Sequence, residues 1–119
     1  MTTQQKQLAG LFCLDHNIKL YIPSTIHGDQ KTDNSEYIRR ALVLFSDLFG
    51  GATSYDAAGA WNSTQLGLIV ENVKIVESYA TKEAVQSGLV KVIEYAKLIK
   101  SELKQEAVSL EYDNKLYLL

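Results

Sequence analysis

Apolar residues recur along the chain with two different periods, and these periods predict its secondary structure. Four stretches alternate between apolar and polar positions or are rich in β-branched residues, which is typical of strands. Pro23 ends the first of them, and Asp113-Asn114 after the last one is expected to turn the chain into a short final strand. The four predicted strands are residues 17–22, 52–61, 68–79 and 107–112, and the short final strand is residues 116–119.

Two further stretches carry apolar residues at every third or fourth position, which predicts amphipathic helices with one buried face each. The first begins at Asn34 or Ser35, whose side-chain oxygen can accept from the free amides of a helix start, and ends at Gly50 or Gly51. Thr81 caps the second helix. The buried faces are expected to be Ile38, Ala41, Leu42, Phe45, Leu48 and Phe49 in the first helix and Val85, Leu89, Val92, Ile93, Ala96, Ile99 and Leu103 in the second.

The order of these elements is strand, helix, strand, strand, helix, strand. It predicts an α+β protein with the ferredoxin-like βαββαβ arrangement, in which two helices lie on one face of a four-stranded antiparallel sheet. The other face of such a sheet has no cover. An open sheet face is polar, is an interface between subunits, or forms one wall of a ligand pocket.

Two segments lie outside this pattern. Residues 1–16 begin polar and become apolar at Leu8, Leu11 and Phe12, so we expect an N-terminal arm, as a short helix or an edge strand, that packs on the body or on a second subunit. The remaining residues, 17–119, are expected to form a single domain. Residues 24–34 form a polar loop that is longer than most connections, which favours a mobile or functional loop.

Composition narrows the classes of function. The 119 residues include 14 acidic residues and 12 Lys and Arg, so the formal net charge is −2 and no positive field attracts nucleic acid. No apolar run reaches the roughly 20 residues that cross a bilayer, and no signal peptide is evident. The single cysteine, Cys13, cannot form an internal disulfide. We therefore expect a cytoplasmic protein with neither a nucleic-acid nor a membrane partner.

Glu71 is the most informative single residue for chemistry. In residues 68–79 it shares its parity with Val73 and Ile75, so a regular strand aims its carboxylate to the same side as apolar residues. A bulge near Glu71 and Asn72 would leave the carboxylate in solvent, and we favour this bulge or a surface position. A buried Glu71 would be a candidate acid, base or ligand anchor.

Aromatic residues lie on the strands that border the expected open face. Tyr55 and Trp61 share a strand parity, which Thr53 and Gly59 also have, and Tyr21 on the first strand adds a third aromatic ring. An aromatic pair beside a glycine suits stacking on a planar ligand. Core packing or a subunit contact suits the pair equally well, and we favour these interpretations.

The remaining candidates give weaker signals. His27 lies in the polar loop, and neither histidine has partners at metal-ligand spacing, so we expect no metal and no cofactor. Gly50-Gly51 is not followed by a phosphate-loop sequence, and no G-x-S-x-G motif occurs. The candidate ligand-binding residues are Tyr21, His27, Thr53, Tyr55, Trp61 and Glu71, of which Glu71 is also the catalytic candidate if the protein is an enzyme.

Several short motifs together resemble a group of small, uncharacterised bacterial and phage proteins. They are Leu20-Tyr21-Ile22, Phe49-Gly50-Gly51-Ala52-Thr53, Gly59-Ala60-Trp61 and Val70-Glu71. The resemblance covers residues 18–79 and implies the opening strand, the helix, the glycine-threonine turn and an acid on the next strand. It implies no catalytic assignment.

We interpret the chain as a non-enzymatic, homo-oligomeric binding protein, most simply a dimer. On this interpretation it binds or sequesters a small polar, nucleotide-like ligand on its open face, as phage-encoded inhibitors of host defence signalling do. This class is favoured over an enzyme because no catalytic constellation is recognisable. The alternatives are a small enzyme of the dimeric ferredoxin-like type, with Glu71 as general acid or base and His27 or Tyr55 assisting, and a protein-interaction module.

Overall fold

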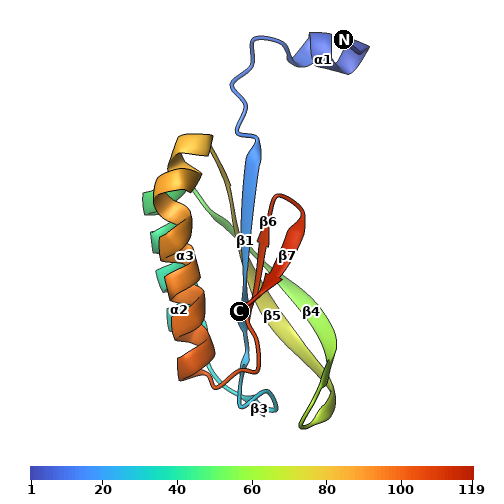
Figure 1. Cartoon of the computed structure of the whole chain (residues 1–119), viewed down its shortest axis with the longest axis vertical. Coiled ribbons are helices and arrows are strands. Elements are labelled where there is room, and N and C mark those ends of the chain that lie inside the picture. The colour runs from blue at the N-terminus through green and yellow to red at the C-terminus, as the bar shows by residue number, and fades with distance from the viewer.

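The structure is a computed structural model that describes all residues, 1–119, and its body has two layers (Figure 1). One layer is an antiparallel sheet with the strand order β4-β5-β1-β6-β7. Helices α2 (Ser35–Phe49) and α3 (Lys82–Glu102) lie on one face of this sheet, and no helix covers the other face (Figure 1). The strands are β1 (His16–Pro23), β4 (Thr53–Ser63), β5 (Gly67–Ala80), β6 (Ser109–Tyr112) and β7 (Lys115–Leu118).

This architecture confirms the α+β class, and the expected order of elements is present as β1-α2-β4-β5-α3-β6. The expected four-stranded sheet is wrong, because β7 pairs with β6 as a fifth strand. The cause is the two-residue turn between them: Asp113 and Asn114 have φ angles of 48° and 68°. Two consecutive left-handed residues form the turn that matches the twist of a tight hairpin. The chain therefore reverses and pairs again after β6.

The ends of the two long helices follow from their flanking residues. Gly50 closes α2 with a φ of 94°, and the Thr81 hydroxyl accepts from the Ala84 amide at 3.1 Å, as expected. At the start of α2 the Asn34 side chain makes no capping bond. Asp33 accepts instead from the Ser35 amide at 2.9 Å. None of the three helices is both long enough and apolar enough to cross a membrane.

The hydrophobic core lies between the sheet and the two helices. Ile18, Leu20 and Ile22, which alternate along β1, are completely buried against it, as is Phe45 of α2. The helix faces expected from the three-and-four spacing line this core: from α2 Ala41, Phe45 and Phe49, and from α3 Val85, Val92, Ala96 and Ile99, with Leu103 just beyond it.

The N-terminal arm stands clear of the body (Figure 1). Its helix α1 (Thr3–Leu8) buries none of its residues and starts with a capping box between Thr2 and Gln5. The apolar side chains that follow are open to solvent: Leu8 is 62%, Leu11 65% and Phe12 86% exposed. The arm therefore does not fold back onto its own body, and packing on a second subunit stays a prediction.

The polar loop of residues 24–34 folds into a small hairpin. Its strands are β2 (Thr25–Ile26) and β3 (Gln30–Lys31), and His27 takes a left-handed conformation with a φ of 60° at the turn. The His27 amide donates to the Leu103 carbonyl at 3.0 Å, which ties the hairpin to the end of α3. The hairpin lies at the bottom of the molecule in Figure 1, so the loop is anchored beside the lower half of the open sheet face.

Candidate functional site

Glu71 lies on the open face of a strand without a bulge. The β4–β5 pairing runs without interruption from Thr53–Glu77 to Ser63–Gly67, with Gly59 opposite Glu71. Our preference for a bulge is therefore wrong, and the half-buried Glu71 shares its face with Ile69, which is 8% exposed. The bulge had been favoured because Leu68 and Val70, which point to the opposite face from Glu71, are apolar. In the structure these two side chains are 66% and 69% exposed.

A cavity of about 420 Å³ opens on this lower half of the sheet. Its floor comes from β4, β5 and the end of β1, and its side wall from the residues between α3 and β6 together with β7. Apolar side chains dominate this lining, and Glu71 is the only charged residue in it. The lining residues are Tyr21, Pro23, Ala57, Ala58, Gly59, Ala60, Trp61, Glu71, Val73, Gln105, Ala107, Val108, Ser109, Leu116 and Leu118.

The β2–β3 hairpin holds one oxygen of the Glu71 carboxylate. Glu71 Oε2 accepts from the Thr25 hydroxyl at 2.9 Å and from the Ser24 amide at 3.3 Å. The Ser24 hydroxyl also donates to the Asn72 carbonyl, so the hairpin is joined to β5 at the acid and at the residue after it. Oε1 of Glu71 accepts no hydrogen bond from the protein. The carboxylate is therefore fixed in orientation and has one free acceptor.

Tyr21 and Trp61 lie in the same cavity as Glu71. The Tyr21 hydroxyl donates to Glu111 Oε1 at 3.1 Å. Burial raises the pKa of Tyr21, and its bond to Glu111 raises that pKa further, so the hydroxyl keeps its proton at neutral pH. Trp61 is half-buried and donates no hydrogen bond within the protein, so the indole is available for packing against a ligand.

The upper half of the open face is polar. Lys19 Nζ lies 3.8 Å from Glu77 and 3.6 Å from Glu111, so three neighbouring strands carry one ion-pair network. Burial lowers the pKa of Lys19, but the carboxylates of Glu111 and Glu77 and nearby Tyr55 more than offset this, and the pKa is raised. This network separates the apolar cavity from the upper end of the sheet.

The structure brings three of the six sequence-predicted site residues together and leaves three outside. Tyr21, Trp61 and Glu71 line the cavity. Tyr55 shares their sheet face, but it is 37% exposed and lies outside the cavity. Thr53 borders a second, more open hollow near the root of the arm, and His27 lies exposed at the tip of the β2–β3 turn. No three His, Cys, Asp or Glu side chains are placed to hold a metal ion.

Several lining residues were not predicted from the sequence. Gln105 reaches the cavity from the loop after α3, and Leu116 and Leu118 come from the fifth strand, while Thr25 of β2 contacts Glu71 from outside the lining. The alternation of residues along β7 could have identified Leu116 and Leu118. They pair with Glu111 and Ser109, and paired residues lie on the same face of a sheet. Nothing in the sequence pattern marks Thr25 or Gln105.

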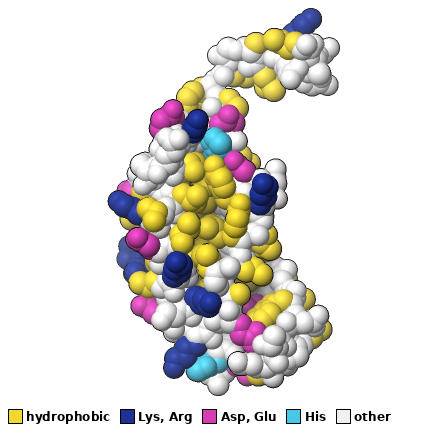
Figure 2. Space-filling view, viewed as in Figure 1, with side chains coloured by type: hydrophobic (Ala, Val, Ile, Leu, Met, Phe, Trp, Pro, Cys, Tyr) yellow, Lys and Arg dark blue, Asp and Glu magenta, His cyan; other side chains and the backbone are white.

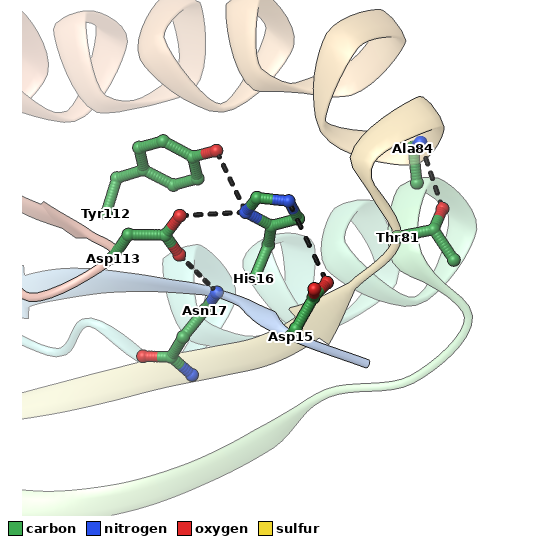
Figure 3. Close-up of polar contacts among 7 residues, drawn as sticks. All are labelled: Asp15, His16, Asn17, Thr81, Ala84, Tyr112 and Asp113. Carbon is green, nitrogen blue, oxygen red and sulfur yellow. Dashed lines mark hydrogen bonds and ion pairs between the residues drawn. The ribbon is translucent and has the colours of Figure 1, made fainter. Parts of the chain in front are cut away.

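A second polar cluster fixes the β6–β7 turn to β1 at the far end of the sheet (Figure 3). Asp113 accepts from His16 Nδ1 and from the Asn17 amide, both at 2.8 Å. The Tyr112 hydroxyl lies 3.3 Å from His16 Nδ1, and the two rings stack. The cluster holds the hairpin whose second strand, β7, forms part of the cavity wall.

The Asp113 cluster predicts a pH-dependent stability. The Asn17 amide and His16 hold the pKa of Asp113 below its usual value of 3.8. A carboxyl whose pKa is lowered by folding stabilises the protein above the unfolded pKa and loses this contribution as the pH falls through the folded pKa. We expect Asp113→Asn, which tolerates the positive φ of the turn as Asp does, to lower the free energy of unfolding by about 1 kcal/mol at pH 7, with a smaller difference at pH 3, as measured by urea unfolding. Asp47→Asn, at an exposed site without an ion pair, is the control, and an equal loss at both pH values would contradict the assignment.

No protein-family model and no curated protein matches the sequence. Two solved structures share its fold. A phage SAM lyase in complex with S-methyl-5′-thioadenosine is 15% identical in sequence and superposes with a TM-score of 0.66, over 92% of each chain. A phage SAM lyase in the apo state, also 15% identical, gives a TM-score of 0.59 over 87% of each chain. At this identity the likeness establishes the fold alone.

These neighbours overturn the expectation of a non-enzymatic protein that sequesters a ligand. Both structures are of an enzyme, a lyase, so in those proteins this fold supports a reaction. They agree with the expectation of a small-molecule ligand, because one of them holds a nucleoside. The sequence had favoured a non-enzymatic protein because no catalytic motif was recognisable, but such motifs mark only reactions that need a dedicated nucleophile, base or metal.

Proposed function

We propose that the protein is a lyase that cleaves SAM (S-adenosylmethionine), or a closely related sulfonium nucleoside, in the cavity around Glu71. One observation carries this proposal: a fold shared with a SAM lyase places a single fixed carboxylate in an apolar cavity beside Trp61. The cavity of about 420 Å³ falls within the size range of small-molecule sites.

The apolar lining suits the loss of charge in this reaction. SAM is S-methyl-5′-thioadenosine joined through a positively charged sulfur to the γ-carbon of an amino-acid chain. When that carbon–sulfur bond breaks, its electron pair stays on sulfur, which leaves as a neutral thioether. Surroundings such as Ala57, Val73 and Leu118 solvate a cation poorly and a neutral thioether well, so they favour the transition state over the bound cation.

The site favours a bond change that needs no protein base. The substrate's own carboxylate can attack the γ-carbon and close a lactone ring, and this step balances without any proton transfer. Formation of an alkene instead requires a base that removes a β-proton. Glu71 is the only carboxylate that lines the cavity, and Thr25 and Ser24 already donate to one of its oxygens. A carboxylate held in this way is suited to binding, and ring closure is the reaction that we propose.

The cavity residues then act by orienting the substrate. Glu71 Oε1 accepts from a hydroxyl or ammonium group of the substrate, and the Trp61 indole packs against its planar base. The Tyr21 hydroxyl is already bound to Glu111, so its ring forms part of the wall beside them. Holding the two reacting ends of one molecule together is a known source of rate enhancement.

We also propose that a second copy of the chain closes the cavity. Leu116 and Leu118 line it and are still 57% and 67% exposed. Figure 2 shows further hydrophobic side chains along the middle of the molecule and on the N-terminal arm. Exposed apolar surface of this extent is typical of subunit interfaces. Native mass spectrometry is expected to find a homo-oligomer, and a monomer at micromolar concentration would contradict it.

Because Cys13 forms no disulfide, we propose a cytoplasmic location.

The test of the proposed function is a direct product analysis. Purified protein is incubated with SAM, and the mixture is separated by liquid chromatography with mass detection. We expect S-methyl-5′-thioadenosine together with homoserine lactone or its hydrolysis product, homoserine, and no alkene amino acid. In water labelled with ¹⁸O at early times, ring closure gives an unlabelled lactone. Quantitative recovery of SAM would overturn the proposal, and an alkene product would overturn ring closure alone.

A further inference from the structure

Gln105 is a buried side chain in the wall of the cavity. It follows the end of α3, is 7% exposed, and lies beside the β2–β3 hairpin. Its Nε2 donates to the Thr25 carbonyl at 2.8 Å and to the Leu103 carbonyl at 3.1 Å. The amide thus joins the hairpin that holds Glu71 to the end of the helix.

These two bonds determine that the nitrogen of the Gln105 amide, and not its oxygen, faces the two carbonyls. Only the NH₂ end of a glutamine can donate, and two carbonyl oxygens meet it here, so the assignment of nitrogen and oxygen follows from chemistry. Both hydrogens are used. The carbonyl oxygen Oε1 is directed away from Thr25 and Leu103 and accepts no hydrogen bond from the protein.

The free oxygen is open to the cavity. No buried side-chain nitrogen or oxygen lacks a partner, so Oε1, which has none, is not sealed inside the protein. Because Gln105 is almost entirely buried and its accessible part lines the cavity, Oε1 is an acceptor that a bound molecule can reach. Such an acceptor is left unpaired when the ligand has no donor, which costs binding free energy.

We propose that Gln105 is a specificity-determining residue that accepts a hydrogen bond from a neutral donor on the nucleoside part of the ligand, either a ribose hydroxyl or the amino group of the base. This inference rests on the proposed function. A neutral donor is the match because Gln105 carries no charge, while Glu71 supplies the negative charge of the same cavity. A site built around such an acceptor rejects analogues that lack the donor more strongly than an apolar wall does.

The experiment is a binding cycle between one residue and one ligand group. S-methyl-5′-thioadenosine and its 2′-deoxy, 3′-deoxy and 6-deamino analogues are titrated calorimetrically into the intact wild-type chain and into Gln105→Met, which keeps the length but removes the acceptor. In the wild type one analogue is expected to bind about ten-fold more weakly than the parent nucleoside. Gln105→Met is expected to bind the parent nucleoside about ten-fold more weakly than the wild type does. The analogue that the wild type binds weakly is expected to bind Gln105→Met as tightly as the parent nucleoside does. The analogue that loses its penalty identifies the donor.

Two control variants separate recognition from support of the hairpin. Asn34→Leu removes the 2.9 Å bond from Asn34 to the Pro23 carbonyl at the other end of the loop, and Asn34 does not line the cavity. Thr25→Val removes the hydroxyl that donates to Glu71 but leaves Gln105 in place. Both variants are expected to keep the wild-type ranking of the four ligands, whatever their overall affinity.

The outcomes distinguish this inference from the proposed function. If the wild type neither binds S-methyl-5′-thioadenosine nor cleaves SAM, the proposed function fails and this inference fails with it. If the wild type binds the parent and all three analogues equally, only the inference about Gln105 fails, and this result needs no variant. The same penalty for one analogue in the wild type and in Gln105→Met would also overturn it.

Discussion

Replacing Glu71 with glutamine is expected to lower kcat/KM for SAM cleavage by about 100-fold, because a charge-assisted hydrogen bond to the substrate is replaced by a neutral one in an apolar cavity. The change is nearly isosteric. Thr25 and Ser24 can still donate to the amide oxygen, so the hairpin stays in place and the free energy of unfolding is expected to change by less than about 1 kcal/mol. Initial rates of S-methyl-5′-thioadenosine formation, with urea unfolding in parallel, measure both effects.

The matched control for this substitution is Glu77→Gln. Glu77 lies on the same strand and the same sheet face as Glu71, but it borders the polar half and pairs with Lys19 outside the cavity. Its replacement is expected to leave kcat/KM within about two-fold of the wild type, because Glu77 does not line the cavity. Equal activities of the two variants would show that the cavity around Glu71 is not the site of reaction.

The sequence predicted the two-layer fold because its signals are local. The alternation of Ile18, Leu20 and Ile22 and the helical spacing around Phe45 each require only a few neighbouring residues to interpret, and both faces are buried as expected. The fifth strand depended on the conformation of Asp113-Asn114, which accept positive φ but do not require it. The pattern therefore allowed β7 without deciding whether it joins the sheet.

The same distinction explains which of the candidate residues line the cavity. Tyr21, Trp61 and Glu71 lie on strands, where parity alone assigns a face, and the sheet then brings them together. His27 lies on a loop, where no period assigns a direction, and it is exposed outside the cavity. Thr53 has the right parity but lies too far along β4 from Glu71, because Glu77 and not Glu71 is its partner.

Gln105 and Thr25 show a limit of another kind. Neither belongs to a motif, and their role depends on a hydrogen bond between residues that are 80 positions apart in the sequence. Contacts of this kind arise only when the end of α3 and the β2–β3 hairpin have been placed side by side. The cavity was not predicted for a related reason, since an apolar cavity with one carboxylate has no sequence signature of its own.

A substitution at Gly59 is expected to separate ligand binding from the stability of the sheet, because it weakens binding while it raises the free energy of unfolding. Gly59 pairs with Glu71 and lines the cavity, its φ is not left-handed, and a Cβ at this position meets no atom within 4 Å. Gly59→Val is thus free of backbone strain and places a branched side chain in the space beside the carboxylate. A β-branched residue in a strand is expected to raise the free energy of unfolding by about 0.5–1 kcal/mol.

Ligand binding, in contrast, is expected to weaken. The valine of Gly59→Val occupies the volume that the nucleoside needs, so affinity for S-methyl-5′-thioadenosine and kcat/KM for SAM are each expected to fall by about 100-fold, as for a misplaced substrate. Calorimetric titration and urea unfolding measure the two effects on the same sample. Thr53→Val, on the same face of β4 but outside the cavity, is expected to change neither affinity nor activity. A more stable Gly59→Val protein that binds as tightly as the wild type would move the site elsewhere on the sheet, whereas loss of binding without loss of stability places the ligand against the Gly59–Glu71 pair.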